Sequence, residues 1–417
     1  ILVMRRKKYP QVEAEITGLA FGGRGIARLD GLAVFVQNAV PGDRALIQVT
    51  RKKKNFAEAY LAELIEPSPD RVAAPCPYSG VCGGCSWQFL RYDKQLDYKR
   101  RHVVECVERI GGIKDPPVHP TVASPAGFEY RNKMEFTCAD RRWLTPAELA
   151  DPAAEKGFAL GLHVPGTFHK VLDTRACLLQ PDVGNRILAE IRGGIRSSGR
   201  PVYGMRSHTG FWRFAVLRSS AASGRWLVNL VTAFEDAAAL APLAERLCAA
   251  FPEISGVVNN VTGRQAAIAV GESERTVAGE PCLCDGIGRF RFEISANSFF
   301  QTNTRSAERL YDTVAAFARL DGGETVLDLY SGTGTIPIML SGGCREVLGI
   351  EMAASAVEDA RRNCRLNGIA NCRFLQGDIQ DRLPELEVRP EVVVIDPPRV
   401  GMAREVAEQV LKLAPGR

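Results

Sequence analysis

Short apolar runs alternate with helix-like segments in the last part of the chain. Four apolar runs rich in β-branched residues indicate buried strands, at residues 326–330, 346–350, 372–375 and 391–395. Residues 355–367 have helical spacing and are followed by Gly368, a common helix stop. Strands that alternate with helices are typical of an open parallel α/β sheet. The pattern therefore predicts a Rossmann-like α/β domain at residues 296–417, with residues 403–413 as its last helix.

A second pattern, of short alternating runs broken by glycine, occupies the start of the chain. It predicts five strands, at residues 11–17, 25–29, 33–36, 44–49 and 57–64. Such strands are typical of a small OB-like β-barrel, which we place at residues 1–66. Residues 67–295 mix strand and helix patterns, including a helix at 87–110, and predict an α+β central domain. Residues 140–156 are polar and contain proline, which indicates a surface insertion. We thus expect a multidomain protein of three domains.

Four polar side chains stand at the ends of the strands predicted for the parallel sheet. They are Tyr330, Glu351, Asp378 and Asp396. Ligands of open α/β sheets bind in the crevice outside the carboxyl ends of the strands. The pattern therefore predicts that these four side chains converge on one binding site.

A glycine-rich turn, Ser331-Gly332-Thr333-Gly334-Thr335, leads from the first of these strands into a helix. Glycine lets a cofactor approach the backbone, and Glu351 follows at the offset where a carboxylate can bind ribose hydroxyls. No Gly-Lys-Ser/Thr sequence follows the glycines, which argues against the phosphate-binding loop of an NTPase. Dinucleotide-dependent enzymes share the strand, the turn and the acid, so the turn alone leaves that class open.

The sequence Asp396-Pro397-Pro398-Arg399 narrows the class of enzyme that the glycine-rich turn left open. Two prolines after an acid at the end of a strand fix the backbone and hold the carboxylate over the pocket. This device favours base methyltransferases that use S-adenosylmethionine over dehydrogenases, although an Asp-Pro pair also occurs in ordinary turns.

Three cysteines lie close together on a segment rich in glycine and proline, at Cys76, Cys82 and Cys85. Three thiolates on such a loop can face one centre, so we predict a metal site. Zinc would need a fourth nitrogen or sulfur ligand, and an iron–sulfur cluster a fourth thiolate, for which Cys177 is the candidate. The remaining cysteines include Cys344 and Cys364, which we expect in the core.

Composition and charge narrow the class of protein. The 417 residues are 46% hydrophobic and 24% charged, as in globular proteins. No apolar run reaches the length of a membrane span and no secretory signal is visible, so we expect a cytoplasmic protein that does not bind membranes. The net charge of +5 is concentrated in basic runs at residues 5–8 and 51–54, which favours nucleic acid, although such runs are also common on solvated faces.

Three phenylalanines of the predicted barrel, Phe21, Phe35 and Phe56, lie near the basic run at residues 51–54 in the predicted fold. Barrels that bind oligonucleotides combine a basic groove with exposed aromatic rings. Phenylalanine in a small barrel is as often part of the core, so both interpretations stay open.

Several motifs occur in a fixed order along nearly the whole chain. They are the barrel, the Cys76/Cys82/Cys85 loop, Tyr130-Arg131-Asn132-Lys133, Cys177, Phe299-Phe300-Gln301-Thr302-Asn303, Leu327-Asp328-Leu329-Tyr330 and Asp396-Pro397-Pro398-Arg399. In this order they resemble the RNA uracil-5-methyltransferase family, and most closely its 23S ribosomal RNA branch, which carries an N-terminal TRAM domain and a 4Fe-4S cluster.

The resemblance implies ligands and a substrate. The cluster ligands would be Cys76, Cys82, Cys85 and Cys177. The contacts to S-adenosylmethionine would be Gln301, Tyr330, Thr335, Glu351, Asp378 and Asp396. The substrate would be a uridine in 23S ribosomal RNA, with transfer RNA as an alternative, and the protein would be a monomer. The flipped target base would stack on Phe299, Phe300 or the segment at residues 130–133, unless those aromatic rings belong to the core.

The chemistry of the family requires a cysteine thiolate that adds to C6 of uracil, so that C5 can attack the methyl group. In the family that cysteine lies in a Ser-Cys-Asn-Pro-like segment on the next strand after Asp-Pro-Pro-Arg, and a glutamate base follows it. Neither is present up to Arg417. We therefore expect a C-terminally truncated and inactive chain whose catalytic residues lie beyond Arg417. A catalytically inactive RNA-binding iron–sulfur module is the alternative from another class.

Overall fold

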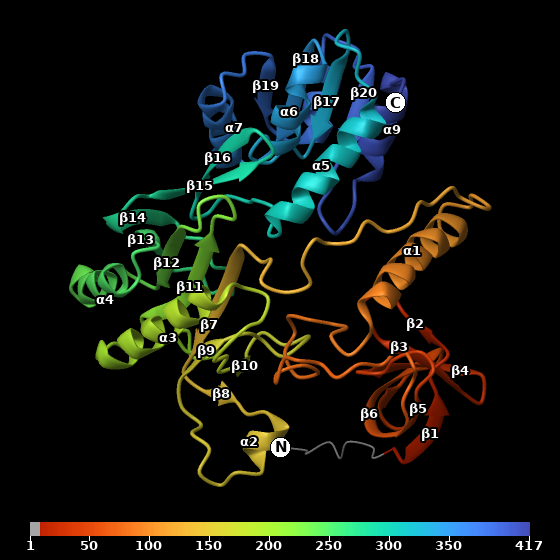
Figure 1. Ribbon diagram of the computed structural model, residues 1–417, viewed down its shortest axis with the longest axis vertical. Coiled ribbons are helices and arrows are strands. Elements are labelled where there is room, and N and C mark those ends of the chain that lie inside the picture. Colours follow the sequence, from red (N-terminus) through yellow and green to blue (C-terminus); the bar gives the residue numbers. More distant parts are fainter. Residues whose placement is uncertain (1–8) are drawn as a thin grey trace. The chain divides into compact units, whose positions relative to one another are not determined.

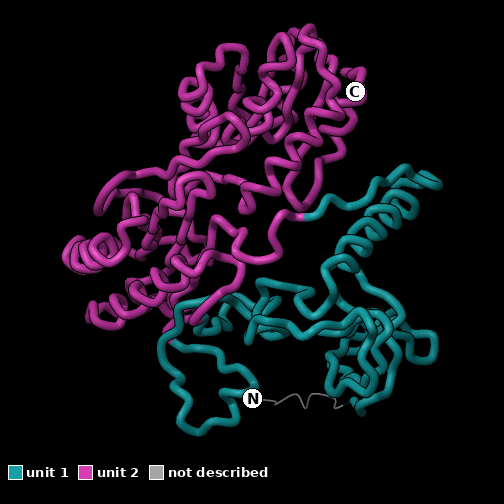
Figure 2. Tube along the Cα trace, in the orientation of Figure 1, with its two compact units in different colours: residues 1–123, 141–174 teal, residues 124–140, 175–417 magenta. Residues whose placement is uncertain are grey.

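The computed structural model describes residues 9–417, which form two compact units (Figure 2). Unit 1 comprises the residues up to 123 together with residues 141–174, and unit 2 comprises residues 124–140 and 175–417. The chain therefore passes between the units three times. The three-domain division at residues 66 and 295 stays a prediction.

A six-stranded sheet forms the start of unit 1 (Figure 1). Its strands are β1 (Gln11–Glu15), β2 (Gly18–Leu19), β3 (Gly25–Leu29), β4 (Leu32–Gln37), β5 (Arg44–Lys52) and β6 (Phe56–Glu66), in the order β1-β5-β6-β4-β3-β2. Ala14 of β1 and Ala27 of β3 share one core with Val34 and Ile47, so the sheet curls around a single interior. The five predicted strands are confirmed, and the basic run at residues 5–8 lies outside the described residues.

The rest of unit 1 contains one long helix and several short elements. They are α1 (Tyr92–Arg109), β8 (Arg142–Trp143), α2 (Pro146–Leu149), β9 (Ala159–Gly161) and β10 (Val171–Leu172). Helix α1 begins five residues later than predicted from position 87, because Trp87 and Leu90 form a turn and Leu90 bridges to Arg71. Most of residues 140–156 is exposed, as expected of a surface insertion, but Thr145 and Glu148 cap a short helix within it.

The first part of unit 2 is a mixed sheet that includes the order β14-β13-β12-β11-β7. Its strands are β7 (Lys133–Ala139), β11 (Trp212–Ser219), β12 (Trp226–Thr232), β13 (Ile254–Val261) and β14 (Ser273–Gly279). Helices α3 (Asp182–Ser197) and α4 (Ala237–Ala250) pack on it and on each other. A hairpin of β15 (Cys282–Ile287) and β16 (Phe290–Ser295) follows, and leads to α5 (Thr304–Ala318).

The last part of unit 2 is a parallel sheet in the order β19-β18-β17-β20. Its strands are β17 (Thr325–Leu329), β18 (Glu346–Glu351), β19 (Cys372–Gln376) and β20 (Val392–Ile395), connected through α6 (Thr335–Leu340), α7 (Ala354–Leu366) and α8 (Ile379–Arg382) and followed by α9 (Arg404–Leu413), with short 3-10 turns at Ser341–Gly343 and Leu383–Glu385. The predicted strands and helices of this sheet are confirmed, with ends that differ by one residue.

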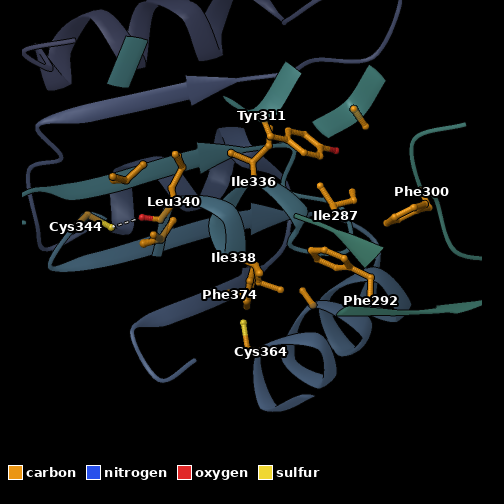
Figure 3. Close-up of a cluster of buried hydrophobic side chains, with 14 of the residues drawn as sticks. Ile287, Phe292, Phe300, Tyr311, Ile336, Ile338, Leu340, Cys344, Cys364 and Phe374 are labelled. Atoms are coloured by element: carbon orange, nitrogen blue, oxygen red, sulfur yellow. Dashed lines mark hydrogen bonds between the residues drawn. The ribbon is translucent and has the colours of Figure 1, made fainter. Parts of the chain in front are cut away.

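Apolar side chains cover both faces of the parallel sheet. One core lies under α5, α6 and α7 and contains Tyr311, Ile338 and Phe374 (Figure 3). The other lies under α8 and α9 and contains Ile379 and Val406. Helices on both faces make this the doubly wound α/β arrangement expected from the sequence. The backbone of Arg417 hydrogen-bonds to Glu391 and Val393 along the edge of β20 that faces away from β17. Within residues 9–417, no helix is both long and apolar enough to span a membrane.

Candidate functional site

The carboxyl ends of the four parallel strands place the four predicted polar residues along one edge of the sheet. Tyr330 directly follows β17, Glu351 ends β18, Asp378 lies just after β19 and Asp396 directly follows β20. Tyr330 and Glu351 are half-buried, whereas Asp378 and Asp396 are exposed. The structure therefore brings the predicted residues to one side of one sheet.

The glycine turn after β17 makes a sharp bend. Every second residue from Tyr330 to Gly334 has a left-handed backbone conformation. Tyr330, Gly332 and Gly334 have φ angles of 66°, 52° and 79°. At Gly334 an added Cβ would lie 2.9 Å from Ala360 and from Phe374, so glycine is required there for close packing of the turn on α7 and β19. At Gly332 an added Cβ would meet no atom within 4 Å. The backbone at Gly332 thus borders open space, as a cofactor-binding turn requires.

The carboxylate of Glu351 is fixed next to this turn. Its Oε2 accepts a hydrogen bond from the backbone N–H of Gly332 over 3.0 Å, and its Oε1 accepts one from Ala353 over 2.8 Å. Each carboxylate oxygen can accept a further hydrogen bond, since a carboxylate offers about four acceptor positions. Glu351 is therefore pre-oriented to accept two hydroxyl donors at the mouth of the turn, as a ribose would offer.

Asp328 is a site residue that the sequence interpretation missed. It lies within β17, is only 1% exposed, and neither carboxyl oxygen has a hydrogen-bond partner in the described part of the chain. Burial raises the pKa of Asp328 well above 3.8, and the neighbouring charges of Asp396 and Glu351 raise it further. A carboxyl group inside an otherwise apolar strand was the available sequence signal, because such a group is rarely buried without a purpose.

Thr335 and Tyr311 form a buried pair behind the glycine turn. Thr335 opens α6 and is 8% exposed, and its hydroxyl bonds to the phenol of Tyr311. Burial raises the pKa of Tyr311, so its hydroxyl stays protonated. Asp378 instead caps α8, where its carboxylate accepts a hydrogen bond from the Gln380 N–H over 2.9 Å. Among the predicted residues, Thr335 and Asp378 thus have structural partners of their own.

Gln301 lies in the segment before α5 and is half-buried. Its backbone oxygen accepts a hydrogen bond from the side chain of Asn132 over 2.9 Å, and Asn132 N–H donates to Thr302 over the same distance. Phe299 is 67% exposed, whereas Phe300 is 3% exposed and packs in the core shown in Figure 3. Of the two rings, only Phe299 is therefore available to stack on a base, and Asn132 is a buried positioning group.

The three cysteines of unit 1 lie on a loop of tight turns and are partly exposed. Backbone Gly84 N–H points at the sulfur of Cys82 over 3.3 Å, and the side-chain amide of Gln88 points at the sulfur of Cys85 over 3.2 Å. N–H donors to sulfur favour thiolates. Among the described residues, however, no three Cys, His, Asp or Glu side chains are gathered as a metal site. Cys177 is buried and belongs to unit 2.

Comparison with known proteins places the chain among RNA-modifying enzymes. Residues 6–62 match the TRAM domain family, and residues 320–397 match a family described as a methyltransferase domain. An uncharacterized RNA methyltransferase of Chlorobaculum tepidum is 42% identical over 397 residues, which cover 93% of this chain and 82% of that protein. One of Halalkalibacterium halodurans is 35% identical and is aligned over 97% of this chain and 86% of its own length.

A solved structure extends the likeness to three dimensions. The tRNA (uracil-54, C5)-methyltransferase of Pyrococcus abyssi, in complex with S-adenosyl-L-homocysteine, superimposes with a TM-score of 0.73 and 26% identity over 97% of this chain and 88% of that chain. The chain combines a TRAM domain with a methyltransferase domain, and it belongs to the family that its motifs resemble, the RNA uracil-5-methyltransferases.

Proposed function

We propose that the protein transfers a methyl group from S-adenosylmethionine to C5 of a uridine in 23S ribosomal RNA. The observation that carries the proposal is the carboxylate of Glu351 held against the N–H of Gly332 beside open space, in a chain that belongs to an RNA methyltransferase family. When bound, S-adenosylmethionine supplies the methyl group.

The residues present fit this cofactor. Glu351 would hold the ribose hydroxyls, and Gly332 leaves room for the cofactor to approach the backbone. The buried carboxyl of Asp328 has no partner in the described part of the chain, and a cationic cofactor would supply one. Gln301, Tyr330 and Asp396 complete the proposed contacts, with Thr335 and Asp378 as the more remote members.

We also propose that transfer proceeds through a cysteine adduct at C6 of the base. The expectation that this cysteine and its glutamate base follow Arg417 stays a prediction. Two cysteines beside the parallel sheet, Cys344 and Cys372, are poor substitutes. Cys344 is buried, and burial raises its pKa to about 11. A hydrogen bond with Cys364, followed by burial, raises the pKa of Cys372 as well. Neither thiol would ionise readily at neutral pH.

Transfer RNA is the second candidate substrate, since the solved relative of Pyrococcus abyssi is named as a tRNA methyltransferase. The two substrates are separated by assaying the protein as its gene encodes it on 23S ribosomal RNA and on transfer RNA, each tritiated at uridine C5. Methyl transfer releases the C5 hydrogen, so tritium release identifies the substrate. Release from transfer RNA alone would replace the ribosomal substrate, and release from neither would favour the inactive RNA-binding module.

Cofactor binding is tested on the 417-residue chain by titration calorimetry with S-adenosylhomocysteine. Loss of a hydrogen bond to a charged group costs about 1.5–3 kcal/mol, so Glu351→Gln should weaken binding roughly tenfold to a hundredfold. Glu385→Gln is the matched control. Glu385 is an exposed residue in the connection between β19 and β20, where it pairs with Arg382. A wild-type chain that melts cooperatively but binds NAD in preference to S-adenosylhomocysteine would overturn the proposal.

The cysteine loop of unit 1 supports a separate proposal, that Cys76, Cys82 and Cys85 hold a 4Fe-4S cluster with Cys177 as fourth ligand. The donor types fit, since three thiols lie on one loop and two of their sulfurs receive N–H donors, but the described side chains are not gathered around one centre. Zinc would fit three thiols and a fourth ligand equally well, so the metal must be measured.

A further inference from the structure

The segment at residues 296–301 contains the exposed ring of Phe299, and we call it the Phe299 segment. Arg218 on β11 is 3% exposed, and its guanidinium donates to the backbone oxygens of Ala296 and Ser298. Hydrogen bonds from a charged donor are stronger than those from a neutral one, and a buried cation left without acceptors is costly. The Phe299 segment is therefore anchored to the central sheet directly before the ring.

The Phe299 segment is also bonded to helix α7 of the parallel sheet. The hydroxyl of Ser298 donates to the carboxylate of Asp359, which is 4% exposed. Asp359 pairs with Arg362 over 2.8 Å, and Arg362 pairs with Glu293 of β16 over 2.7 Å. These bonds tie the residue before Phe299 to the helix that packs on the glycine turn.

One side chain joins the Phe299 segment to the glycine turn itself. Thr333 lies between Gly332 and Gly334 and is 4% exposed. Its hydroxyl donates to the backbone oxygen of Phe299 over 3.4 Å, which is a long and weak hydrogen bond. On the other side of Thr333, the N–H of Gly332 donates to Glu351, the proposed ribose contact. Thr333 therefore stands between the residue proposed to hold the cofactor and the ring available to a base.

We propose that Thr333 couples the two binding events, so that bound cofactor raises the affinity for RNA. This inference rests on the proposed function, which supplies both ligands. A cofactor seated against Gly332 restricts the motion of the turn, and Thr333 passes that restriction to the backbone of Phe299. Ligands that order the same bonded unit bind cooperatively even without a large movement. Because coupling is a free energy shared by both events, RNA raises the affinity for the cofactor by the same factor.

The test measures the affinity of the full chain for a fluorescein-labelled oligouridine by fluorescence anisotropy, with and without saturating S-adenosylhomocysteine. Coupling between sites is commonly about 5–150-fold, and a single weak hydrogen bond favours the lower end, so S-adenosylhomocysteine should tighten oligouridine binding about fivefold. Thr333→Val removes the hydroxyl with little change of shape and should abolish this factor. Thr333→Ser keeps the hydroxyl and should retain the factor. A merely structural role would not change the ratio of two affinities measured on the same folded variant.

Two further variants and a second measurement complete the test. Phe299→Leu removes the exposed ring, so it should weaken oligouridine binding and eliminate the effect of S-adenosylhomocysteine. Ser341→Ala is the matched control, because it removes a buried hydroxyl that donates to the backbone oxygen of Ile338 over 2.8 Å in the turn before β18. Hydrogen exchange should show that S-adenosylhomocysteine protects the amides of the Phe299 segment in wild type and in Thr333→Ser, but not in Thr333→Val.

Three outcomes would overturn the proposal. They are equal affinity of the wild-type chain for oligouridine with and without S-adenosylhomocysteine, a fivefold effect that persists in Thr333→Val, and no binding of oligouridine. In each case, calorimetry that still shows binding of S-adenosylhomocysteine would leave the proposed function standing. A chain that binds oligouridine but not S-adenosylhomocysteine would instead remove the proposed function, and the coupling with it.

Discussion

The side-chain amide of Asn132 donates to the backbone oxygen of Gln301 over 2.9 Å and to the hydroxyl of Thr304 over 2.8 Å. Thr304 in turn donates to the buried carboxylate of Asp285. These bonds join the start of β7 to the segment that carries the proposed cofactor contact and the exposed ring of Phe299. Asn132 therefore positions that segment from within the central sheet, and it is too buried to touch RNA itself.

We expect Asn132→Ala to lower both stability and cofactor affinity. Leaving buried partners unsatisfied costs about 1–3 kcal/mol, so the free energy of unfolding should fall by that order. Release of the Gln301 backbone should also weaken S-adenosylhomocysteine binding by roughly tenfold, measured by calorimetry. Asn371→Ala is the control, because Asn371 likewise bonds to backbone oxygens, of Ser341 and Cys344, but beside the amino end of β19. Equal loss of affinity in both variants would reduce Asn132 to a general stabilising role.

The two glycines of the turn should respond differently to alanine. Both lie at positive φ, which costs a residue with a Cβ about 1–2 kcal/mol. Gly334→Ala also forces a methyl group against Ala360 and Phe374, and such overpacking adds about 1–3 kcal/mol. Gly332→Ala meets no atom, but its methyl group would stand where the cofactor is proposed to lie. Chemical denaturation should thus show that Gly334→Ala is less stable than Gly332→Ala. Calorimetry should show the larger loss of S-adenosylhomocysteine affinity in Gly332→Ala, although that variant is the more stable of the two. The reverse order of stability would contradict this account.

Asp328 should make stability depend on pH. Burial raises its pKa in the folded state above the unfolded value of 3.8, so the folded chain holds the proton more tightly. The stabilisation that this pKa shift contributes is fully present below the unfolded pKa of 3.8. It is lost as the pH rises through the raised pKa of the folded state. Asp328→Asn cannot ionise, so its melting temperature relative to wild type should rise as the pH increases above about 4. Asp381→Asn, at an exposed position in α8, should show no such trend. A constant difference for Asp328→Asn would mean that the carboxyl is not protonated in the fold.

The cysteine loop predicts a measurable cluster. Protein purified without oxygen should contain about four iron and four sulfide per chain if a 4Fe-4S cluster is present. Cys82→Ser and Cys85→Ser should lose both and melt at a lower temperature. Cys106→Ser is the control, because Cys106 is exposed on α1 outside the loop. Stoichiometric zinc in place of iron would correct the assignment while keeping the loop as a metal site.

The sequence predicted the parallel sheet well because its signals are local. Local periodicity and a following glycine predict both the strand at residues 372–376 and the helix at residues 354–366. Tyr330, Glu351, Asp378 and Asp396 then reach one edge by the geometry of parallel strands alone. Where a local signal exists it was sometimes overlooked, as in the Thr145 and Glu148 capping pair that makes a short helix in the surface insertion.

The positioning network could not be predicted in the same way. Asn132 and Gln301 are 169 positions apart, and no periodicity links them. Phe299 and Phe300 are neighbours of the same type, yet one is exposed and the other lies in the core, where its ring packs against Phe292 of β16. The burial of Asp328 likewise follows from the layers on both faces of the sheet.

The interleaved course of the chain has a consequence for its synthesis on the ribosome. Strand β7 of unit 2 is made before residues 141–174 of unit 1, and its neighbour β11 emerges only with residues 212–219. The edge of the nascent β7 that pairs with β11 therefore stays unpaired while residues 141–211 are translated. Neither unit can be released as a single continuous fragment, and a ribosome pause within residues 141–211 would prolong the interval in which β7 is open to wrong pairing.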